Sequence, residues 1–294
     1  MISVILVNYN GAADTLECIM SIQKSIEVDY RIIVVDNSSS DDSLDVLRNY
    51  SKKVPFILIV AKDNNGFSAG NNLGILEALR LGTDYVLLLN NDTIVEPFTL
   101  RELIQGIERH GCSLTMGKIK YADNRDRIWY AGGSFNKLIA KARHWHYQEV
   151  DNVDMKNDLE VYFATGCCLC MTVATIQKIG LMDEDYFLYE EDADYCLRII
   201  NSGHKMFYIP KAIIYHKVNA STKKIPGVIG YYMFRNKLML INKRYHGVEK
   251  IPAYIYAILR GIYGCIKGEQ SIDVFLLALF AFCNKERGKS SRYF

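Results

Sequence analysis

The first third of the chain alternates short apolar runs with stretches that carry apolar residues at helical spacing. The clearest run, Tyr85–Leu89, has five apolar residues without alternation, which is typical of a strand buried on both faces of a parallel sheet. Three earlier apolar runs also predict strands: Ile2–Val7, Arg31–Val35 and Phe56–Val60. Four strands separated by three helical stretches predict a right-handed, Rossmann-like α/β fold, in which helices flank a mostly parallel sheet.

Each of the four predicted strands stops at a polar cluster. The clusters are Asn8–Gly11, Asp36–Ser40, Asp63–Gly66 and Asn90–Asp92. Ligands of open α/β sheets bind just beyond the carboxyl ends of the strands. We therefore expect the four clusters to line one crevice at that edge of the sheet.

The cluster after the fourth strand has side chains that suit a cation. Asn90, Asn91 and Asp92 offer two amides and a carboxylate, which can ligate a hard cation that also holds a diphosphate. The alternative is an Asx-rich turn that leads into the next helix, because Asn and Asp favour turns. The cluster alone is compatible with both interpretations.

The segment from Asn65 to Gly74 is rich in glycine but differs from the usual phosphate-binding loops. The chain has neither the dinucleotide-binding fingerprint in its first turn nor a P-loop pattern. Gly70 and Gly74 lie four apart on one face of a helix predicted to begin near Ser68, which allows close backbone approach. Either this spacing serves tight packing of helix on sheet alone, or Asn72 also points at the crevice.

Between residues 113 and 161 the pattern is weaker. Gly132 and Gly133 indicate a turn, and residues 143–147 combine basic and aromatic side chains. We interpret that run as the solvated face of a hairpin, with an acceptor path as the alternative.

Clear strand signals return after residue 200. Residues 205–209 and 212–215 predict two short strands split by Pro210, which cannot donate to a strand ladder. The second strand delivers His216 to its carboxyl end. A lone histidine is more often structural than a ligand, so this pattern leaves the role of His216 open.

Residues 182–198 form an acidic and aromatic stretch that is poorly suited to burial without a purpose. Asp194 and Arg198 are spaced i, i+4 and can pair on a helix. Asp192 can cap that helix. In isolation, capping is the simpler explanation of Asp192, and only the other motifs give catalysis more weight.

Beyond Pro226 the composition shifts to apolar helices, predicted over 228–245, 254–266 and 272–282. Neither of the last two reaches the ~20 uninterrupted apolar residues that a transmembrane helix needs. Basic residues at the ends of these aromatic faces suit an interfacial helix or a dimer contact. Packing onto the preceding domain is the third interpretation.

Composition narrows the class of protein. The 35 basic and 33 acidic residues nearly cancel, so we expect no nucleic-acid partner. Cys167 and Cys170 have the spacing of half a zinc site, but no second pair completes it, and a reduced cysteine in an apolar run behaves as a small hydrophobe. The N-terminus lacks the features of a signal peptide, and we expect a cytoplasmic protein with reduced thiols.

The motifs together resemble the successive signatures of family 2 glycosyltransferases, and most closely the bacterial rhamnosyltransferase-like branch. The strand-end motifs are Val7–Asn10, Val35–Ser39, Asn64–Asn72 and Leu89–Thr93. The acidic stretch matches the family's aromatic-x-Tyr-x-Glu-Asp-x-Asp-x-Cys-x-Arg signature. The resemblance implies the GT-A fold, a nucleotide-sugar donor and an inverting mechanism that uses a divalent metal, Mn²⁺ or Mg²⁺.

The resemblance also implies roles for single residues. Asp192 would be the general base for the acceptor hydroxyl, with Glu191 as the second candidate. Asp92 and His216 would bind the metal, although Asn90 replaces the first acid of the family's commoner Asp-x-Asp. The residues that would hold the donor are Tyr9 against the base, Asp36 on the base edge or the ribose, and Asn65, Gly66, Asn72, Asn90 and Asn91 around the pocket.

These inferences give an expected organisation and function. Residues 1–225 would form the catalytic domain, with a nucleotide-sugar half at 1–110 and an acceptor half at 111–225, and residues 226–294 would form a helical extension. We expect transfer from dTDP-rhamnose or a UDP-sugar to a glycan or a polyprenyl-linked acceptor in bacterial cell-surface polysaccharide synthesis. We expect a cytoplasmic protein, whose helical extension would hold it on the inner face of the membrane, join it into a homodimer, or pack on the catalytic domain.

Two other classes of protein stay open at this point. A nucleotidyltransferase could share the sheet and its metal edge, but it would need a basic phosphate loop, and residues 8–11 hold no Lys or Arg. A non-catalytic nucleotide-sugar-binding protein would use the same crevice without a base at Asp192.

Overall fold

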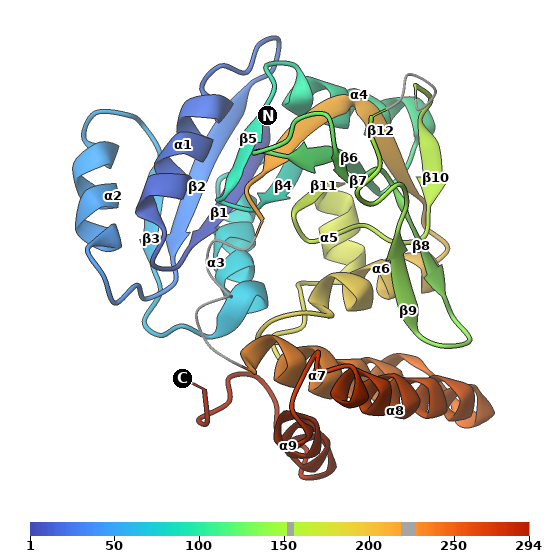
Figure 1. Cartoon of the computed structure of the whole chain (residues 1–294). Coiled ribbons are helices and arrows are strands. Elements are labelled where there is room, and N and C mark those ends of the chain that lie inside the picture. Colours follow the sequence, from blue (N-terminus) through green and yellow to red (C-terminus); the bar gives the residue numbers. More distant parts are fainter. Residues whose placement is uncertain (152–155, 219–226, 294) are drawn as a thin grey trace.

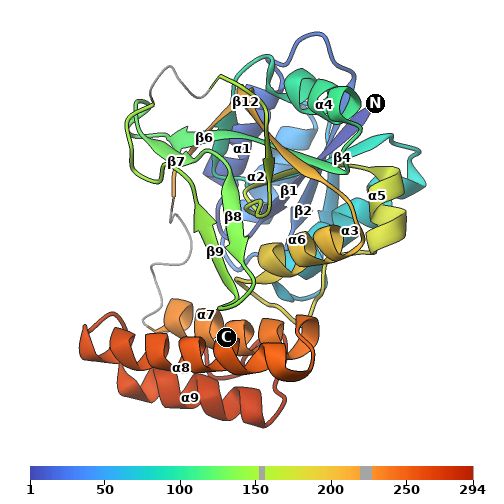
Figure 2. The same ribbon diagram turned by 90° about the vertical axis from the view of Figure 1, so that its right-hand side faces the viewer.

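The computed structural model describes residues 1–151, 156–218 and 227–293. A twisted central sheet is flanked by helices, and the C-terminal helices form a layer below it (Figure 1). Figure 2 shows this layer from the side, with a hairpin reaching down to it from the sheet.

The N-terminal half of the sheet is parallel, as the apolar runs predict. Its strands are β1 (Ile2–Asn8), β2 (Tyr30–Asp36), β3 (Ile57–Val60) and β4 (Tyr85–Leu89), in the spatial order β4-β1-β2-β3. The intervening helices are α1 (Ala12–Ile22), α2 (Ser43–Ser51) and α3 (Gly66–Arg80). Each of Val86, Leu87, Leu88 and Leu89 is at most 3% exposed, and burying one such side chain contributes ~1.5–3 kcal/mol to folding.

The second half of the sheet mixes directions. Beyond β4 the order is β11-β6-β12-β10, with β11 (Cys168–Thr172) antiparallel to both β4 and β6 (Leu114–Tyr121). The remaining pieces are β5 (Thr93–Val95), β7 (Ile128–Tyr130) and β10 (Leu159–Val161), with α4 (Thr99–His110), α5 (Val173–Ile179) and α6 (Glu191–Asn201).

The two strands that we expected on either side of Pro210 are one strand, β12 (Met206–His216). It runs parallel to β6, and its register shifts between Ile209 and Ile213. The missing N–H of Pro210 therefore falls in an irregularity, where no ladder bond is lost, and the strand continues to His216.

Residues 133–144 form a hairpin, but its turn lies between Asn136 and Lys141 and not at Gly132 and Gly133, and only Arg143 and His144 of the run 143–147 belong to its strands. Gly132 has φ +96°, a conformation that favours glycine, and β8 (Gly133–Asn136) pairs antiparallel with β9 (Lys141–His144). Phe135 and Ala142 pack against the core, which leaves the other face of the hairpin outward.

The C-terminal helices are α7 (Val228–Arg244) and, after a 3₁₀ turn at Gly247–Glu249, α8 (Lys250–Ile266) and α9 (Ile272–Cys283). Helix α7 shares the main hydrophobic core, with Tyr231, Tyr232 and Leu240 fully buried. No helix of the described residues is long and apolar enough to cross a membrane. The domain boundary expected at residues 225–226 lies outside the described ranges.

Candidate active site

Polar side chains join the carboxyl ends of β1, β2 and β4. Asn8 Nδ2 donates to Asp36 Oδ1 at 2.8 Å, and Thr15 Oγ1 donates to Asn8 Oδ1 at 2.9 Å. Asn91 Nδ2 donates to Thr15 Oγ1 at 2.9 Å. The end of β3 joins the same edge, because Asn37 Nδ2 donates to Asn64 Oδ1 at 3.0 Å. The expected gathering of the strand ends along one edge is confirmed.

Asp36 lies inside this network. Its side chain has no exposed surface and also accepts from Ser39 Oγ at 2.7 Å and from the Ser39 backbone N–H at 3.0 Å. The carboxylate therefore orders the turn after β2 and has no surface open to a ligand in this structure. Tyr9 is half-buried and Asn65 is exposed, so both can contact a ligand.

The structure gives Asn72 a task other than the donor contact that we expected. Its Nδ2 donates to Met182 O at 2.9 Å and to Glu184 Oε1 at 2.8 Å, and its Oδ1 accepts from Met182 N at 3.0 Å. The amide is thus fully engaged in holding the start of the acidic stretch against α3.

Gly66 serves the same contact between α3 and the acidic stretch. It has φ +95°, and a Cβ there would lie only 2.2 Å from Phe187 O. The next residue, Phe67, donates its N–H to that carbonyl at 2.9 Å. Glycine is needed here because two backbones meet, and the close approach accounts for it without a ligand.

Two side chains far apart in sequence meet at the end of β4. Strand β5 pairs with β12 so that Thr93 faces His216, and Lys217 N donates to Asp92 O at 3.0 Å. This register brings His216 Nε2 to 3.1 Å from Asp92 Oδ1. Asp92 and His216, the two residues predicted to bind a metal, are therefore neighbours.

The pair fits a divalent cation as a two-ligand site. Two ligands at the ~2.1 Å distance that Mg²⁺ prefers lie about 3 Å apart in octahedral geometry, and the pair has that separation. No group of three His, Cys, Asp or Glu side chains suited to a metal occurs among the described residues. The remaining ligands would have to come from a bound molecule such as a diphosphate. Trp129 packs edge-on against the His216 ring at 4.7 Å and fixes its orientation.

Asp192 stands beside this edge, held by backbone N–H groups. Its Oδ2 accepts from Gly166 N at 3.0 Å and its Oδ1 from Ala193 N at 2.7 Å. Cys167, next to Gly166, accepts from Asn90 N at 3.0 Å, so one backbone connection links Asp192 to the Asn90–Asp92 cluster. The Asp192 carboxylate is part-exposed and can meet a hydroxyl group from solvent.

Glu191 is the more buried of the two acids, at 8% exposure, and its Oε2 has no hydrogen-bond partner among the described residues. Burial, and then the charge of Asp192, raise the pKa of Glu191 well above its ordinary value. Burial also raises the pKa of Asp192, while the Gly166 and Ala193 N–H groups and the Lys237 charge lower it. The geometry thus favours Asp192 as the more accessible of the two acids.

The loop before these acids is strained and is held from α7. Tyr189 and Glu190 have φ +67° and +72°, which is costly for residues other than glycine. Asn236 Nδ2 donates to Leu188 O at 2.7 Å and to Tyr189 O at 3.0 Å, and Lys237 Nζ donates to Glu190 Oε2 at 2.6 Å. Helix α7 therefore supports the loop that carries the candidate base.

Asp194 is structural, as its helical spacing to Arg198 suggested. It is fully buried and accepts from Arg198 Nε at 3.0 Å, from Arg244 Nε at 2.6 Å and from Tyr186 Oη at 3.2 Å. The cysteines of the 167–170 run are buried and free, and burial raises their thiol pKa values. No second metal centre is formed there by the described residues.

Sequence reasoning missed three residues of the site: Trp129, Gly166 and Lys237. Gly166 was visible only as an interruption of an apolar run. The triplet Arg235-Asn236-Lys237 was visible as a polar break in an apolar helix, and that break was the available signal for a buried polar contact.

Comparison with known proteins identifies the family of this chain. Residues 3–180 match the family model described as glycosyl transferase family 2. The chain is 27% identical over 208 residues to the low-salt glycan biosynthesis hexosyltransferase Agl10 of Haloferax volcanii, covering 67% of this chain and 61% of that protein. It is 24% identical over 253 residues to the dTDP-rhamnosyl transferase RfbF of Shigella flexneri, covering 82% of this chain and 80% of that one.

A solved structure gives the same fold. The mannosyltransferase PcManGT from Pyrobaculum calidifontis, in complex with GDP-Man and Mn²⁺, superposes with a TM-score of 0.61 at 14% identity, covering 96% of this chain and 75% of the other. The fold is that of the GT-A glycosyltransferases, as the sequence motifs implied. The chain belongs to glycosyl transferase family 2.

Proposed function

We propose that this protein is an inverting, metal-dependent glycosyltransferase that moves a sugar from a nucleoside diphosphate to an acceptor hydroxyl. The observation that carries the proposal is the placement of Asp192. A part-exposed carboxylate, held by two backbone N–H groups, is connected through residues 166–167 to the strand end that bears Asp92. That arrangement supports the assignment of Asp192 to the acceptor and of the neighbouring strand end to a cation that holds the donor.

Each side chain has a defined task in this reaction. Asp192 accepts the proton of the attacking hydroxyl, which increases its nucleophilicity. Asp92 and His216 would hold the divalent ion, whose charge stabilises the departing diphosphate. Because the hydroxyl attacks from the face opposite the leaving group, the anomeric configuration inverts. Asn236 holds the backbone of the loop before Asp192, and Lys237 holds the Glu190 side chain of the same loop.

For the donor we propose a thymidine or uridine diphosphate sugar, with dTDP-rhamnose first. The relative from Shigella flexneri is a dTDP-rhamnosyl transferase, which supports this order. Asp36 Oδ2 accepts one hydrogen bond, from Ser39 N, and could accept another from the imide N–H that uracil and thymine share once the Ser39 turn opens to expose it. Tyr9 can cover the base face, while Asn65, Asn90 and Asn91 line the approach.

For the acceptor we propose a glycan on a membrane-bound carrier, as in cell-surface polysaccharide synthesis. Helix α8 exposes an apolar stripe at helical spacing, with Ile251, Ile255, Leu259 and Ile266 each more than half exposed. Helix α9 adds three more exposed apolar side chains at i, i+4, i+8: Ile272, Leu276 and Phe280.

Charge on this surface favours an anionic membrane as its occupant. Lys267 Nζ lies 5.8 Å from the exposed Tyr263 ring, and the Arg292 guanidinium lies 5.9 Å from the Phe280 ring. Cations placed on exposed aromatic rings suit a surface of anionic lipids.

The proposal is tested by nucleoside diphosphate release over a panel of donors, with and without a sugar acceptor. The expected result is acceptor-stimulated release of thymidine or uridine diphosphate, with the anomeric configuration inverted in the product. Release of pyrophosphate would indicate a nucleotidyltransferase instead. Tight donor binding with no turnover on any glycan or lipid-linked acceptor would favour a non-catalytic binder.

A further inference from the structure

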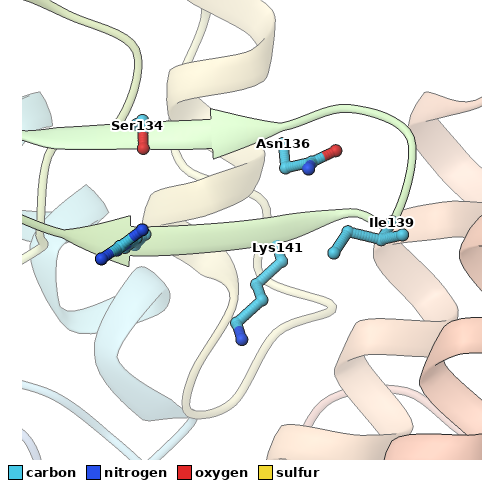
Figure 3. A pocket seen from close by; sticks show the side chains of 5 residues that line it. Ser134, Asn136, Ile139 and Lys141 are labelled. Carbon is cyan, nitrogen blue, oxygen red and sulfur yellow. The ribbon is translucent and has the colours of Figure 1, made fainter.

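One face of the β8–β9 hairpin carries a group of polar side chains. The strand register sets Ser134 opposite Arg143 and Asn136 opposite Lys141. Because side chains alternate along a strand, these four lie on the same face. Together with Ile139 at the hairpin turn they line an open hollow of about 360 Å³ (Figure 3). We call this surface the hairpin hollow.

The opposite face of the hairpin anchors it. Phe135 and Ala142 pack against the hydrophobic core, and the His144 ring stacks on Phe163 at 5.8 Å. Tyr130, which comes just before the hairpin, donates from Oη to Phe163 O at 2.6 Å. The hairpin hollow is therefore built on a packed support.

The hairpin hollow offers hydrogen-bond donors and positive charge without a carboxylate. Lys141 and Arg143 are exposed, and neither makes an ion pair within the part of the chain that the structure describes. Asn136 Oδ1 is occupied by Leu138 N at 3.0 Å, which leaves the amide N–H groups to face outward as donors. Two cations, an amide and a hydroxyl are the groups that bind a phosphate.

The basic residues below the hairpin behave differently. Lys237 pairs with Glu190, Lys243 with Asp183 and Asp185, and Arg244 with Asp194. Acids are thus abundant in this region, yet none pairs with Lys141 or Arg143 among the described residues. The charge in the hairpin hollow is left for a ligand.

One lysine joins the hairpin hollow to the candidate base. Lys237 Nζ donates to Ala140 O at 2.7 Å, between the lining residues Ile139 and Lys141. The same Nζ donates at 2.6 Å to Glu190, two residues before Asp192. A molecule in the hairpin hollow would therefore lie next to the segment that Lys237 joins to the loop of the candidate base.

The far side of the hairpin hollow adjoins apolar surface. Lys141 Nζ lies 5.9 Å from the centre of the Tyr256 ring on α8. Leu259 and Tyr263 follow Tyr256 at i+3 and i+7 on the same side of that helix, and they are 59% and 50% exposed. An anionic group held by Lys141 could thus continue into an apolar chain lying along α8.

We propose that the hairpin hollow binds the phosphate of a lipid-carried acceptor, with the lipid along α8 and the sugar extending toward Asp192. The inference rests on the proposed function, since it names the acceptor class of that reaction. A diphosphate carries more charge than a monophosphate and matches the two cations better. The interaction is binding only, and no bond is made or broken in the hairpin hollow.

The test is a calorimetric titration of the full-length protein with farnesyl diphosphate in metal-free buffer. Lys141→Gln/Arg143→Gln should weaken binding about 10- to 100-fold, because two charge-assisted hydrogen-bond donors are lost. Lys137→Gln, which removes an exposed charge of the same hairpin outside the hollow, should leave binding unchanged. The conservative Lys141→Arg should retain it.

Three results would overturn the assignment. Equal affinity of the double variant and the parent would place the ligand elsewhere, and equal affinity for inorganic diphosphate would remove the lipid from the proposal. Tighter binding of a soluble uronic-acid glycan would assign the hairpin hollow to acidic sugars. Because the titration needs no donor, metal or turnover, the hairpin hollow can fail while glycosyl transfer is observed, and the reverse.

Discussion

At the scale of single residues, the pair Asp92 and His216 makes the metal requirement testable. Asp92→Asn keeps the shape but loses the charge of the only acid in the pair. We expect a fall in kcat/KM of about 10²-fold or more, because charge stabilisation by a metal contributes several kcal/mol. Thorough chelation of the parent should have the same effect, with recovery on adding Mn²⁺ or Mg²⁺. Asp84→Asn, at an exposed acid bonded to the N-terminus, is the matched control.

Undiminished turnover of the chelated parent would remove the metal from the mechanism. Undiminished turnover of Asp92→Asn alone would show that the cation does not depend on the Asp92 carboxylate.

Glu191 gives a prediction on stability with a definite sign. The pKa of Glu191 is higher in the folded protein than in the unfolded chain, because burial disfavours the charged form. The stability that the neutral side chain contributes is therefore present below the unfolded pKa and is lost as the pH rises through the folded pKa. Glu191→Gln cannot ionise and should escape that loss. We expect the variant to gain about 1 kcal/mol or more over the parent at pH 8, and little at pH 4, since one pKa unit corresponds to about 1.4 kcal/mol.

Denaturant unfolding at the two pH values measures this difference. The exposed Glu249→Gln should show none of it. A Glu191→Gln protein that is less stable than the parent at pH 8 would mean that the charged carboxylate has a partner, contrary to its orphaned Oε2.

At the scale of elements, α7 supports the loop that precedes the candidate base. Lys237 bonds the loop of Glu190, and its charge lowers the pKa of Asp192 against the effect of burial. Lys237→Met should therefore raise the pKa of the base, and the acid limb of kcat/KM should move to higher pH. Lys237→Arg should restore part of the parental profile, because it returns the charge.

The measurement is a pH profile of kcat/KM together with donor affinity at one pH. Donor affinity should stay within a few-fold of the parent, since Lys237 lies on the acceptor side. Lys211→Met, at an exposed lysine of β12, controls for loss of charge in general. An unchanged acid limb in Lys237→Met would show that the lysine acts on structure alone.

At the scale of the whole molecule, α8 and α9 present an apolar surface that the chain itself leaves uncovered. We expect the protein to float with vesicles of phosphatidylglycerol, and less with phosphatidylcholine or at high salt. Ile255→Glu/Ile262→Glu, at side chains 54% and 41% exposed, should reduce flotation at least about tenfold, because two charges would enter the interface. Leu76→Glu, at 52% exposure on α3, should not.

Light scattering on the same variants distinguishes membrane contact from self-association. A parental dimer that becomes a monomer in Ile255→Glu/Ile262→Glu, with no vesicle binding, would assign the surface to a second copy. A monomer that ignores anionic vesicles would contradict both. Substitution is preferable to truncation, because removing α7 would also remove the hydrogen bonds that Asn236 and Lys237 make to the loop before Asp192.

Much of this fold could be predicted from the sequence, because buried parallel strands are apolar throughout and end in polar residues. The run Tyr85–Leu89 corresponds to β4 residue for residue. Asp92 and His216 were assigned to one site through the family motifs. Their contact in the structure depends on the pairing of β5 with β12. Local pattern could not supply that register.

What the sequence could not supply are contacts whose partners lie far along the chain. Asn72 looked like a donor ligand, but its partners are 110 and 112 residues away. Lys237 and Glu190 are 47 residues apart, and nothing local marks them as a pair. Gly66 was expected to shape the donor pocket, and its close approach to the backbone of Phe187 was not visible in the sequence.

The central claim is that Asp192 is the general base, and one measurement tests it most directly. Turnover and donor affinity should be compared in the parent, Asp192→Asn and Glu191→Gln. The account predicts that Asp192→Asn folds and binds the donor within a few-fold of the parent, while kcat falls about 10²–10⁴-fold, the usual contribution of a general base. Glu191→Gln should be milder. Near-parental turnover of Asp192→Asn beside an inactive Glu191→Gln would transfer the role to Glu191, and full activity of both would contradict the mechanism.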